Sequence, residues 1–423
     1  MKTQRCARPR IPVLVAVSVL LAACGTGSSD AAGRERTTAE VDSQSSGSVV
    51  DGDGSPVRTV SEVYQTVDYD AAPAASALRD DRESDEFPPP LIEPDRIVSG
   101  GVPPDGIPAI DSPQFAPIDQ TDFLQPNEGL IVVQVEDEAK AYPIQILIWH
   151  EIVNDEIGGL PVTVTYCPLC NSALAFDRRV GSRLLDFGTS GELYQSALVM
   201  YDRQTESLWA HFTGQGLVGH YAGATLTPVP AQMLSFEKVE ARFPGALVLT
   251  RDTGHARPYG TNPYIGYDEE TTDPFGPFFD GEIDPRLPPK ARVVGVTIDD
   301  DAYAINITEP ESTTVVEVSV AGQDLVVFHR PGLASALDRA SVATGRDVGQ
   351  TGTFLAADGD GNPLTFAVDQ DRFIDNETGS EWTLAGEAAA GKMAGQSLEP
   401  VPQLNTFWFA WSTYHPETGL VDG

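Results

Sequence analysis

The sequence predicts a mainly β fold (β-rich α+β), made of two tandem, divergent copies of a β-meander-type domain packed together. Three observations favour this class. Short segments with alternating apolar residues are separated by Gly-, Pro- and Asn-rich turns, helix signals are few, and the pattern of the first half recurs in the second. With 423 residues the chain is long enough for two ordinary domains.

Residues 1–23 predict a signal peptide. A basic start precedes the apolar run 11–23, which is too short to span a bilayer. The run ends in Leu21-Ala22-Ala23-Cys24-Gly25, which resembles a bacterial lipobox. We therefore expect lipidation of Cys24, and an extracytoplasmic protein anchored to the bacterial cell membrane as a lipoprotein. The alternative is an ordinary signal peptide that happens to contain a cysteine.

Residues 24–95 predict a disordered stalk behind the lipidated N-terminus. They are rich in Ser, Gly, Asp, Thr and Ala and contain few large apolar residues, so they cannot bury enough surface to fold. The whole chain has 62 acidic and 27 basic residues, a formal charge of -35. This balance argues against nucleic acid as a partner, because binding to phosphates requires Lys and Arg. The membrane is the expected partner, and the scattered acidic residues indicate a solvated surface.

Strand patterns begin after residue 96. Ile131, Val133 and Val135 alternate on one predicted strand, and PVTVTY forms another that ends at Cys167. The stretch ALAFDRRVGSRLLDFGTSG predicts two strands joined at Gly181, and ELYQSALVMYDRQTESLWAHFTGQG predicts two more.

Helices are predicted only at 145–152 and 231–243, the second ending before Pro244. We expect the large apolar rings to fill cores, namely those of Trp209, Trp382, Trp408 and Trp411.

The two halves of the sequence resemble each other. VVQVEDEAKAY at 132–142 matches VVGVTIDDDAY at 293–303, an offset of 293 − 132 = 161. Further matches follow in the same order, including Asp202, Thr205 and Trp209 with Asp375, Thr378 and Trp382. We infer an internal duplication, with copy one at 96–250 and a degenerate copy two at 290–423. The alternative is that both halves are generic β-meanders.

The duplication bears on function. At an offset of 161, Cys167 corresponds to Phe328 and Cys170 to Pro331, so copy two lacks both cysteines. The scaffold therefore does not need them, which favours a functional role. Residues 251–289 connect the copies and are too rich in aromatic residues for a flexible linker, so we expect them to pack across the two copies and to cover a cleft. We expect copy two to help wall the site.

Five motifs together resemble a known family: WHEIVND, GGLPVTVTYCPLCNSALAFDR, FGTSGELYQSALVMYDRQTESLW, RPYGTNPYIGYD and TFWFAWSTYHPETGL. They are similar to the bacterial and archaeal family catalogued as domain of unknown function 3179. The resemblance covers about residues 97 to 423 and implies that this region is a single family unit. It implies no particular enzymatic reaction. Asn171 stands where the resemblance leads us to expect Gly.

Cys167 and Cys170 form a C-P-L-C motif that has three interpretations. In the first they bind zinc, copper or iron, because two thiolates at this spacing reach one ion and His150 can supply a third ligand. The other histidines, His211, His220 and His255, are weaker candidates. In the second the pair is a dithiol/disulfide redox couple, although the long helix that follows the cysteines in thioredoxin-like proteins is missing.

In the third interpretation the pair is a structural disulfide or a buried thiol pair in a non-catalytic cell-envelope binding or scaffolding protein.

Further site candidates are Glu151, beside His150, and Arg257 and Tyr259 in the connecting segment. The pair Asp177-Arg178 is a weaker candidate, because such pairs commonly form ion pairs at strand ends. No catalytic serine elbow, phosphate loop or H-E-x-x-H zinc motif is present.

Overall fold

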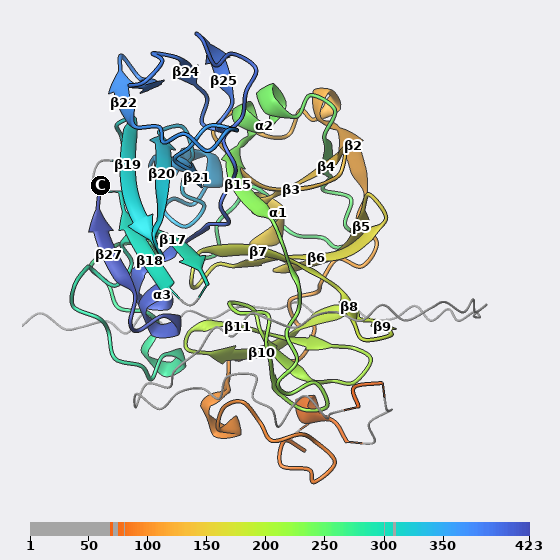
Figure 1. The fold of residues 1–423 in the computed structure, drawn as a ribbon. Coiled ribbons are helices and arrows are strands. Elements are labelled where there is room, and N and C mark those ends of the chain that lie inside the picture. The colour runs from red at the N-terminus through yellow and green to blue at the C-terminus, as the bar shows by residue number, and fades with distance from the viewer. Residues whose placement is uncertain (1–67, 71–74, 80, 300, 308–309) are drawn as a thin grey trace, which may run out of the picture. The chain divides into compact units, whose positions relative to one another are not determined.

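The computed structural model describes residues 68–70, 75–79, 81–299, 301–307 and 310–423, and the predicted signal peptide and Cys24 lie outside them. The described residues are mainly β, which confirms the mainly β part of the predicted fold class (Figure 1). The helices are short: α1 is Ile144–Leu147, α2 is Phe236–Arg242 and α3 is Trp408–Tyr414. Single turns of 3-10 helix occur at Ala77–Arg79, Pro94–Arg96, Ile118–Gln120, Gly276–Phe278 and Val342–Thr344.

The first half contributes three larger sheets and one small hairpin. The first sheet has the strand order β15 (Ala231–Ser235), β3 (Gly129–Val135), β4 (Glu138–Pro143), β16 (Leu247–Leu249), β2 (Phe115–Pro117). The second has the order β14 (Pro228–Val229), β7 (Ser172–Asp177), β6 (Leu160–Cys167), β5 (Ile152–Ile157). The third has the order β1 (Val98–Ser99), β10 (Phe187–Tyr194), β11 (Ala197–Asp202), β12 (Leu208–Ala210), β13 (Gly216–Val218). The hairpin joins β8 (Arg179–Val180) to β9 (Arg183–Leu184), around the predicted turn at Gly181.

The second half contributes three sheets. The first has the order β26 (Leu404–Phe407), β17 (Arg292–Ile298), β18 (Asp301–Asn306), β27 (Gly419–Asp422). The second has the order β19 (Thr314–Val320), β20 (Gln323–Arg330), β21 (Gln350–Leu355). The third has the order β22 (Phe366–Asp369), β23 (Arg372–Asp375), β24 (Glu381–Trp382), β25 (Ala388–Ala390).

The two halves share one strand order. In each, a hairpin (β3–β4 or β17–β18) is flanked by an antiparallel strand on one side and a parallel strand on the other. A seven-residue helix follows the antiparallel strand directly, α2 after β15 and α3 after β26. A three-stranded meander comes next to the hairpin in both, β5–β6–β7 and β19–β20–β21. This correspondence supports the duplication, which stays an inference about descent.

The hairpin register corrects the alignment offset. Glu136 and Asp299 occupy the same place in the two hairpin turns, with φ of 51 and 53, so the offset is 299 − 136 = 163. The predicted offset of 161 was wrong by two residues. A shift of two keeps the same residues on the same face of a strand, so the alternating apolar pattern matches at either offset. At 163, Cys167 corresponds to Arg330 and not to Phe328. Cys170 then corresponds to no paired strand residue, because β20 and β21 are joined by the longer loop 331–349.

Residues from both halves pack together in shared hydrophobic cores. Strand β3 is buried on both faces: Ile131 and Val133 pack in a cluster that includes Trp408 of the second half. Leu130 and Val132 pack in a cluster that includes Phe328. Burial of each such side chain stabilises the fold by about 1.5–3 kcal/mol. The four tryptophans expected in cores, Trp209, Trp382, Trp408 and Trp411, are all buried. The halves are therefore not independent in packing.

Three sequence predictions differ from the structure. The helix predicted at 145–152 is shorter, because α1 ends at Leu147 and strand β5 begins at Ile152. Residues 231–243 begin as strand β15 and only then form α2, because β15 pairs along its whole length with β3. Part of the predicted stalk is ordered: Ala77, Leu91 and Ile92 are buried, and the amide of Leu91 donates to the carbonyl of Leu217. Average composition does not reveal a few well-placed apolar residues of this kind.

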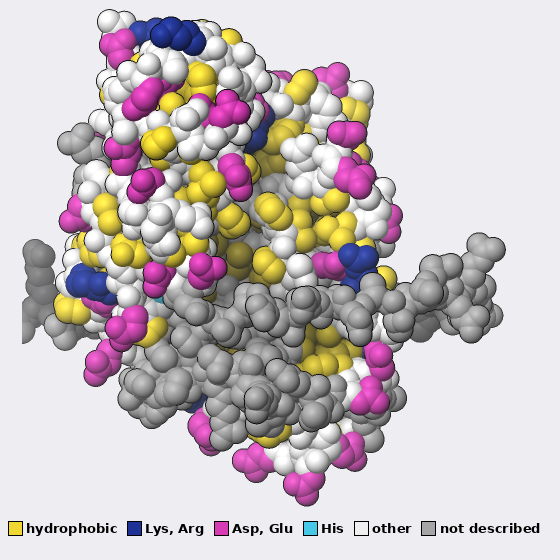
Figure 2. Space-filling view, in the orientation of Figure 1, with side chains coloured by type: hydrophobic (Ala, Val, Ile, Leu, Met, Phe, Trp, Pro, Cys, Tyr) yellow, Lys and Arg dark blue, Asp and Glu magenta, His cyan; other side chains and the backbone are white. Residues whose placement is uncertain are grey.

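None of the described helices is long and apolar enough to cross a membrane. On the face shown in Figure 2, acidic side chains are scattered and do not gather into one patch. This agrees with the interpretation of the charge as a solvated surface.

Candidate functional site

The C-P-L-C motif is the turn between β6 and β7. Cys167 is the last residue of β6 and pairs with Ser172, the first residue of β7. The amide of Asn171 donates to the carbonyl of Pro168 (3.3 Å) and closes the turn. Asn171 has φ 50, in the left-handed region where Gly is usual and Asn is the best-tolerated alternative. This geometry explains why Asn can stand where the family resemblance leads us to expect Gly.

Both cysteines of the turn are buried free thiols. The amide of Leu198 on β11 donates to Sγ of Cys167 (3.4 Å). Sγ of Cys170 lies 2.9 Å from Oγ of Ser172 and 3.9 Å from the carbonyl oxygen of Cys167. The β10–β11 hairpin therefore supplies a donor to the first sulfur, and the strand that follows the turn supplies a hydroxyl to the second.

The two thiols are electrostatically unequal. Burial opposes ionisation of Cys167, but hydrogen bonds from the Cys170 thiol and from the amides of Cys170, Leu198 and Leu169 outweigh it, so the pKa of Cys167 is lowered. Burial raises the pKa of Cys170 well above its ordinary value, and the neighbouring Cys167 adds to this. Cys167 is therefore the sulfur that ionises first, and thiolates are the reactive form of cysteine.

A short hydrogen-bonded chain leads from Cys170 to a buried histidine. Oγ of Ser172 lies 2.7 Å from Nε2 of His211, which is fully buried. Burial lowers the pKa of His211 to about 3, so the ring is neutral. A neutral ring can accept from the Ser172 hydroxyl or donate to it, depending on the tautomer. The hydrogen bonds can therefore be donated from a Cys170 thiol through Ser172 to His211, or from His211 through Ser172 to a Cys170 thiolate. The ring carries no net charge in either case.

Glu151 is a buried acid beside this centre. Burial, and then the charge of Cys167, raise the pKa of Glu151 to about 8. The carboxyl group is therefore largely protonated at neutral pH. Its backbone is left-handed (φ 59) and its carbonyl accepts the amide of Tyr166 at the end of β6. A left-handed non-glycine residue costs about 1–3 kcal/mol, and such residues are concentrated at functional sites.

Distant segments enclose the turn. In the segment 251–289, the hydroxyl of Tyr267 donates to the carbonyl of Leu169 (3.0 Å). From the second half, Oγ1 of Thr406 (2.7 Å) and the amide of Phe407 (3.1 Å) donate to the carbonyl of Cys170. The segment 251–289, called the covering segment below, therefore contacts the C-P-L-C turn through Tyr267, and the second half contacts it through Thr406 and Phe407.

The turn of the β10–β11 hairpin, whose strand β11 contributes the Leu198 donor, has a strained backbone. Gln195 and Ser196 both have positive φ, 51 and 59, and both are buried. The amide of Ser196 donates to the carbonyl of Phe278 in the covering segment (2.7 Å). Among the described residues, neither polar atom of the Gln195 side chain has a hydrogen-bond partner. Strain and an unsatisfied amide are features that active-site turns share.

His150, the predicted third metal ligand, is engaged elsewhere. Nδ1 of His150 lies 2.7 Å from the carbonyl of Pro108, and Nε2 lies 2.6 Å from the hydroxyl of Tyr259. Burial, opposed by the bond to Pro108, lowers the pKa of His150 to about 4. Among the described residues, no group of three or more His, Cys, Asp or Glu is placed to hold a metal ion. A zinc, copper or iron site with Cys167, Cys170 and His150 as its ligands does not fit this geometry.

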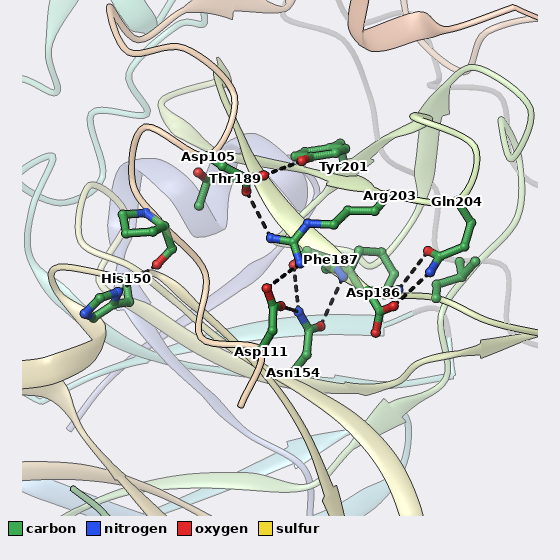
Figure 3. A network of polar contacts seen from close by, with 12 residues as sticks. Asp105, Asp111, His150, Asn154, Asp186, Phe187, Thr189, Tyr201, Arg203 and Gln204 are labelled. Carbon is green, nitrogen blue, oxygen red and sulfur yellow. Dashed lines mark hydrogen bonds and ion pairs between the residues drawn. The ribbon is translucent and has the colours of Figure 1, made fainter. Parts of the chain in front are cut away.

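A polar network holds the loop that carries Pro108. Figure 3 shows Arg203 between Asp105 (3.2 Å) and Asp111 (2.6 Å), with Asn154 donating to Asp111 (2.7 Å). Asn154 also exchanges hydrogen bonds with the backbone of Phe187. This network fixes loop 105–111 against β5 and β10, and so fixes the carbonyl that binds His150.

The remaining predicted residues divide into two groups. Tyr259 contacts His150 directly, and the charge of Arg257 acts on both of them, so these three belong together. Arg178 binds Leu185, Asp155 and Asp186, and Asp177 pairs with Arg179. Asp177 ends β7 and Ser172 begins it, which separates them by about 16 Å of extended strand. Asp177 and Arg178 therefore lie away from the thiols.

Sequence reasoning missed Ser172, the role of His211 and the amide of Leu198. Ser172 could have been found, because it follows the motif on the strand that pairs with Cys167. His211 lies 39 residues from Ser172, and only the fold brings the two together. The Leu198 donor is a backbone group and leaves no signal in the sequence.

Comparison with known proteins gives one match. No curated protein and no solved structure matches the chain. A family model described as protein of unknown function (DUF3179) matches residues 104–418, which include the C-P-L-C turn, Ser172, His211 and the covering segment. The chain therefore belongs to the DUF3179 family.

Proposed function

We propose that this chain is an extracytoplasmic lipoprotein whose Cys167–Cys170 pair is a redox-active dithiol. The observation that carries the proposal is that the two sulfurs have different hydrogen-bond partners, the amide of Leu198 at Cys167 and the hydroxyl of Ser172 at Cys170. Hydrogen bonds favour the thiolate of Cys167, while Cys170 stays protonated and is bonded to Ser172. Cys167 can therefore act as the attacking thiolate, and Cys170 as the thiol that resolves the mixed disulfide, which are the two roles in thiol–disulfide exchange.

The proposed reaction has two steps, attack by Cys167 and resolution by Cys170. The Cys167 thiolate attacks one sulfur of a small disulfide RSSR, forming a mixed disulfide and releasing RS⁻. Cys170 then attacks Sγ of Cys167, the second RS⁻ leaves, and it takes the proton of Cys170. The hydroxyl of Ser172 donates to the Cys170 sulfur as that sulfur loses its proton. In sum the protein, starting as the Cys167 thiolate and the Cys170 thiol, loses two electrons and one proton, and RSSR becomes one RS⁻ and one RSH.

Access to the buried sulfurs limits the substrate. Both thiols are enclosed by the β10–β11 turn and by the covering segment through Tyr267 and Phe278. Because both sulfurs are buried, exchange requires the covering segment or the β10–β11 turn to move first, and a small-molecule disulfide needs the smaller opening.

The redox state tests the proposal. The full-length chain in detergent is equilibrated in glutathione buffers of stepped potential, quenched by alkylation and weighed by mass spectrometry. We expect one two-electron transition, lost in Cys167→Ser and in Cys170→Ser. A pair that stays reduced, or stays oxidised, at every potential contradicts the proposal and leaves the structural interpretation.

The same preparation distinguishes the metal interpretation. Metal content is measured after anaerobic purification, with wild type and Cys167→Ser side by side. The redox proposal predicts less than stoichiometric metal in both proteins. Stoichiometric zinc, copper or iron that Cys167→Ser loses would replace the redox proposal by a metal site.

Anchoring is proposed from the sequence alone, because Cys24 lies outside the described residues. We expect Cys24→Ala to move the protein from the membrane fraction to the soluble extracytoplasmic fraction. Retention of the variant in the membrane would contradict the lipid anchor, while cytoplasmic retention of both proteins would contradict the export signal.

A further inference from the structure

A second candidate site lies on the far side of the C-P-L-C turn. A cavity of about 460 Å³ is lined mainly by the second half, and Asn171, from the turn, and Met233 border it from the first half. Its volume is within the range of small-molecule sites, which is about 300–1,000 Å³. Nothing in the redox proposal uses this cavity.

Two amide groups in the cavity have donors to spare. Oδ1 of Asn171 accepts from the Tyr166 hydroxyl (3.2 Å), and Oδ1 of Asn405 accepts from Thr351 (3.1 Å). These contacts orient the side chains so that each NH₂ group is left over. Neither NH₂ group is hydrogen-bonded to an acceptor among the described residues, and both side chains line the cavity.

Two guanidinium groups at the cavity share one buried carboxylate. Arg292 (2.9 Å) and Arg346 (3.1 Å) both bind the carboxylate of Asp268, which is fully buried. One anion therefore serves two cations. Among the described residues, Nε of Arg292 is buried and has no hydrogen-bond partner. Arg346 keeps 38% of its side-chain surface exposed, so it can contact a ligand.

Among the described residues, three further carboxylates line the cavity, those of Asp347, Glu270 and Glu311. Asp347 accepts the amides of Gly332 (2.7 Å), Leu333 (3.3 Å) and Gly349 (2.9 Å), so its oxygens are already used. Glu270 and Glu311 are exposed at the rim. The cavity therefore offers the donors of Asn171, Asn405 and Arg346. The rest of its lining combines apolar side chains (Met233, Val293, Leu333 and Val348) with polar ones (Asn306, His329, Thr351 and Thr406).

We propose that this cavity binds a small organic carboxylate. The carboxylate would accept from Arg346 and from the amides of Asn171 and Asn405, since guanidinium and amide donors match its two oxygens. The apolar lining favours an organic acid over inorganic phosphate, because it offers surface to a carbon skeleton. The ligand would also contact the back of the thiol turn through Asn171, whose neighbour is Cys170.

Binding is tested on the full-length chain in detergent. Thermal shift and titration calorimetry use sodium acetate, L-lactate, succinate and benzoate, each against sodium chloride at equal ionic strength and against sodium phosphate. We expect at least one organic acid to raise the melting temperature and to bind with millimolar or tighter affinity. No response to any of the four acids beyond the chloride control overturns the proposal. Phosphate binding as tight as the best acid overturns the assignment to an organic carboxylate.

Matched variants locate the binding. Asn405→Asp keeps the acceptor for Thr351 but replaces the donor by a negative charge, and it should weaken binding at least tenfold. Arg346→Gln should do the same, whereas Arg372→Gln, an exposed residue outside the cavity, should bind as wild type does. Equal binding by all three variants contradicts the site. A Cys167→Ser/Cys170→Ser protein should bind normally, so a failed redox proposal leaves this result intact.

Discussion

At the scale of single residues, the centre depends on groups whose protonation differs from that of exposed side chains. Glu151 is neutral at neutral pH because burial raises its pKa to about 8, and His211 is neutral because burial lowers its pKa to about 3. Neither group places a full charge beside the sulfurs at neutral pH. The thiolate of Cys167 is therefore stabilised by hydrogen bonds from amides and from the Cys170 thiol, without an ion pair.

The first prediction concerns the pH dependence conferred by Glu151. Its folded pKa is raised, so the protonated form stabilises the fold below the unfolded pKa of 4.5, and this stability is lost as pH rises to about 8. Glu151→Gln removes that titration. The unfolding free energy of the variant minus that of wild type should increase by about 1.4 kcal/mol per pH unit across this window. Denaturant titrations at several pH values measure it, and a difference that does not change with pH contradicts the pKa.

The second prediction concerns Ser172. Ser172→Ala removes the hydroxyl that lies between Cys170 and His211 and that favours the Cys170 thiolate. Closure of the disulfide should slow at least tenfold, while the first attack by Cys167 should change little. Stopped-flow reaction with a small disulfide separates the two steps. Ser412→Ala, which removes a buried hydroxyl bonded to Trp408, is the control and should leave both rates unchanged.

The sequence located the thiols but not their partners. Cys167 and Cys170 were found because cysteine is rare and the spacing is informative. His150 was chosen as a partner because it is close in sequence, yet Pro108 and Tyr259 bind its ring. His211, the histidine connected to the thiols, was ranked below it. Distance along the chain is a poor guide to contacts in a β structure, where pairing brings distant segments together.

At the scale of elements, two turns repeat one polar motif. Asp202 accepts from Thr205 and from Nε1 of Trp209 (3.0 Å). Asp375 accepts from Thr378 and from Nε1 of Trp382 (2.9 Å). These are the residues that the sequence comparison paired. Their identical roles are the strongest local argument for the duplication.

The third prediction distinguishes these two aspartates. Burial raises the pKa of Asp202, whereas at Asp375 the hydrogen bonds from Trp382 and Thr378 outweigh burial and lower it. Replacement by Asn should cost about 1–3 kcal/mol at either site. Asp375→Asn should cost less at about pH 3.5 than at about pH 6, because the stability from a lowered pKa is lost in acid. Asp202→Asn should show the opposite trend in unfolding titrations, and parallel trends would contradict the assigned shifts.

Element types were predicted better than element boundaries. The strands at 131–135 and at PVTVTY were correct, as was the turn at Gly181. The helix predicted at 231–243 was half wrong, since Ala231–Ser235 pairs with β3. Local propensity could not show this, because the pairing depends on a strand about 100 residues earlier in the chain.

At the scale of the whole molecule, the halves share their cores, and an N-terminal segment completes one of them. The composition of residues 24–95 predicts a stalk, yet Ala77, Leu91 and Ile92 belong to the largest hydrophobic cluster. A truncation that begins near residue 95 would expose this surface. Measurements therefore require the full chain.

The fourth prediction tests this docking. Leu91→Ala should lower the unfolding free energy by about 2–4 kcal/mol, because it removes a buried side chain and leaves a cavity. Leu184→Ala, at a side chain that is half exposed, should change it by less than about 0.5 kcal/mol. Thermal or denaturant unfolding compares them. If the two variants lose equally little stability, the segment is not part of the core.

The most direct test of a dithiol centre is to trap the mixed disulfide. Cys170→Ser and Cys167→Ser are each incubated with oxidised glutathione, quenched in acid and weighed. We predict that Cys170→Ser accumulates one glutathione on Cys167, because the attacking thiol is present and the resolving thiol is absent, and that Cys167→Ser reacts far more slowly. Faster reaction of Cys167→Ser, or no adduct on either variant, would contradict the assignment of Cys167 as the nucleophile of a dithiol centre.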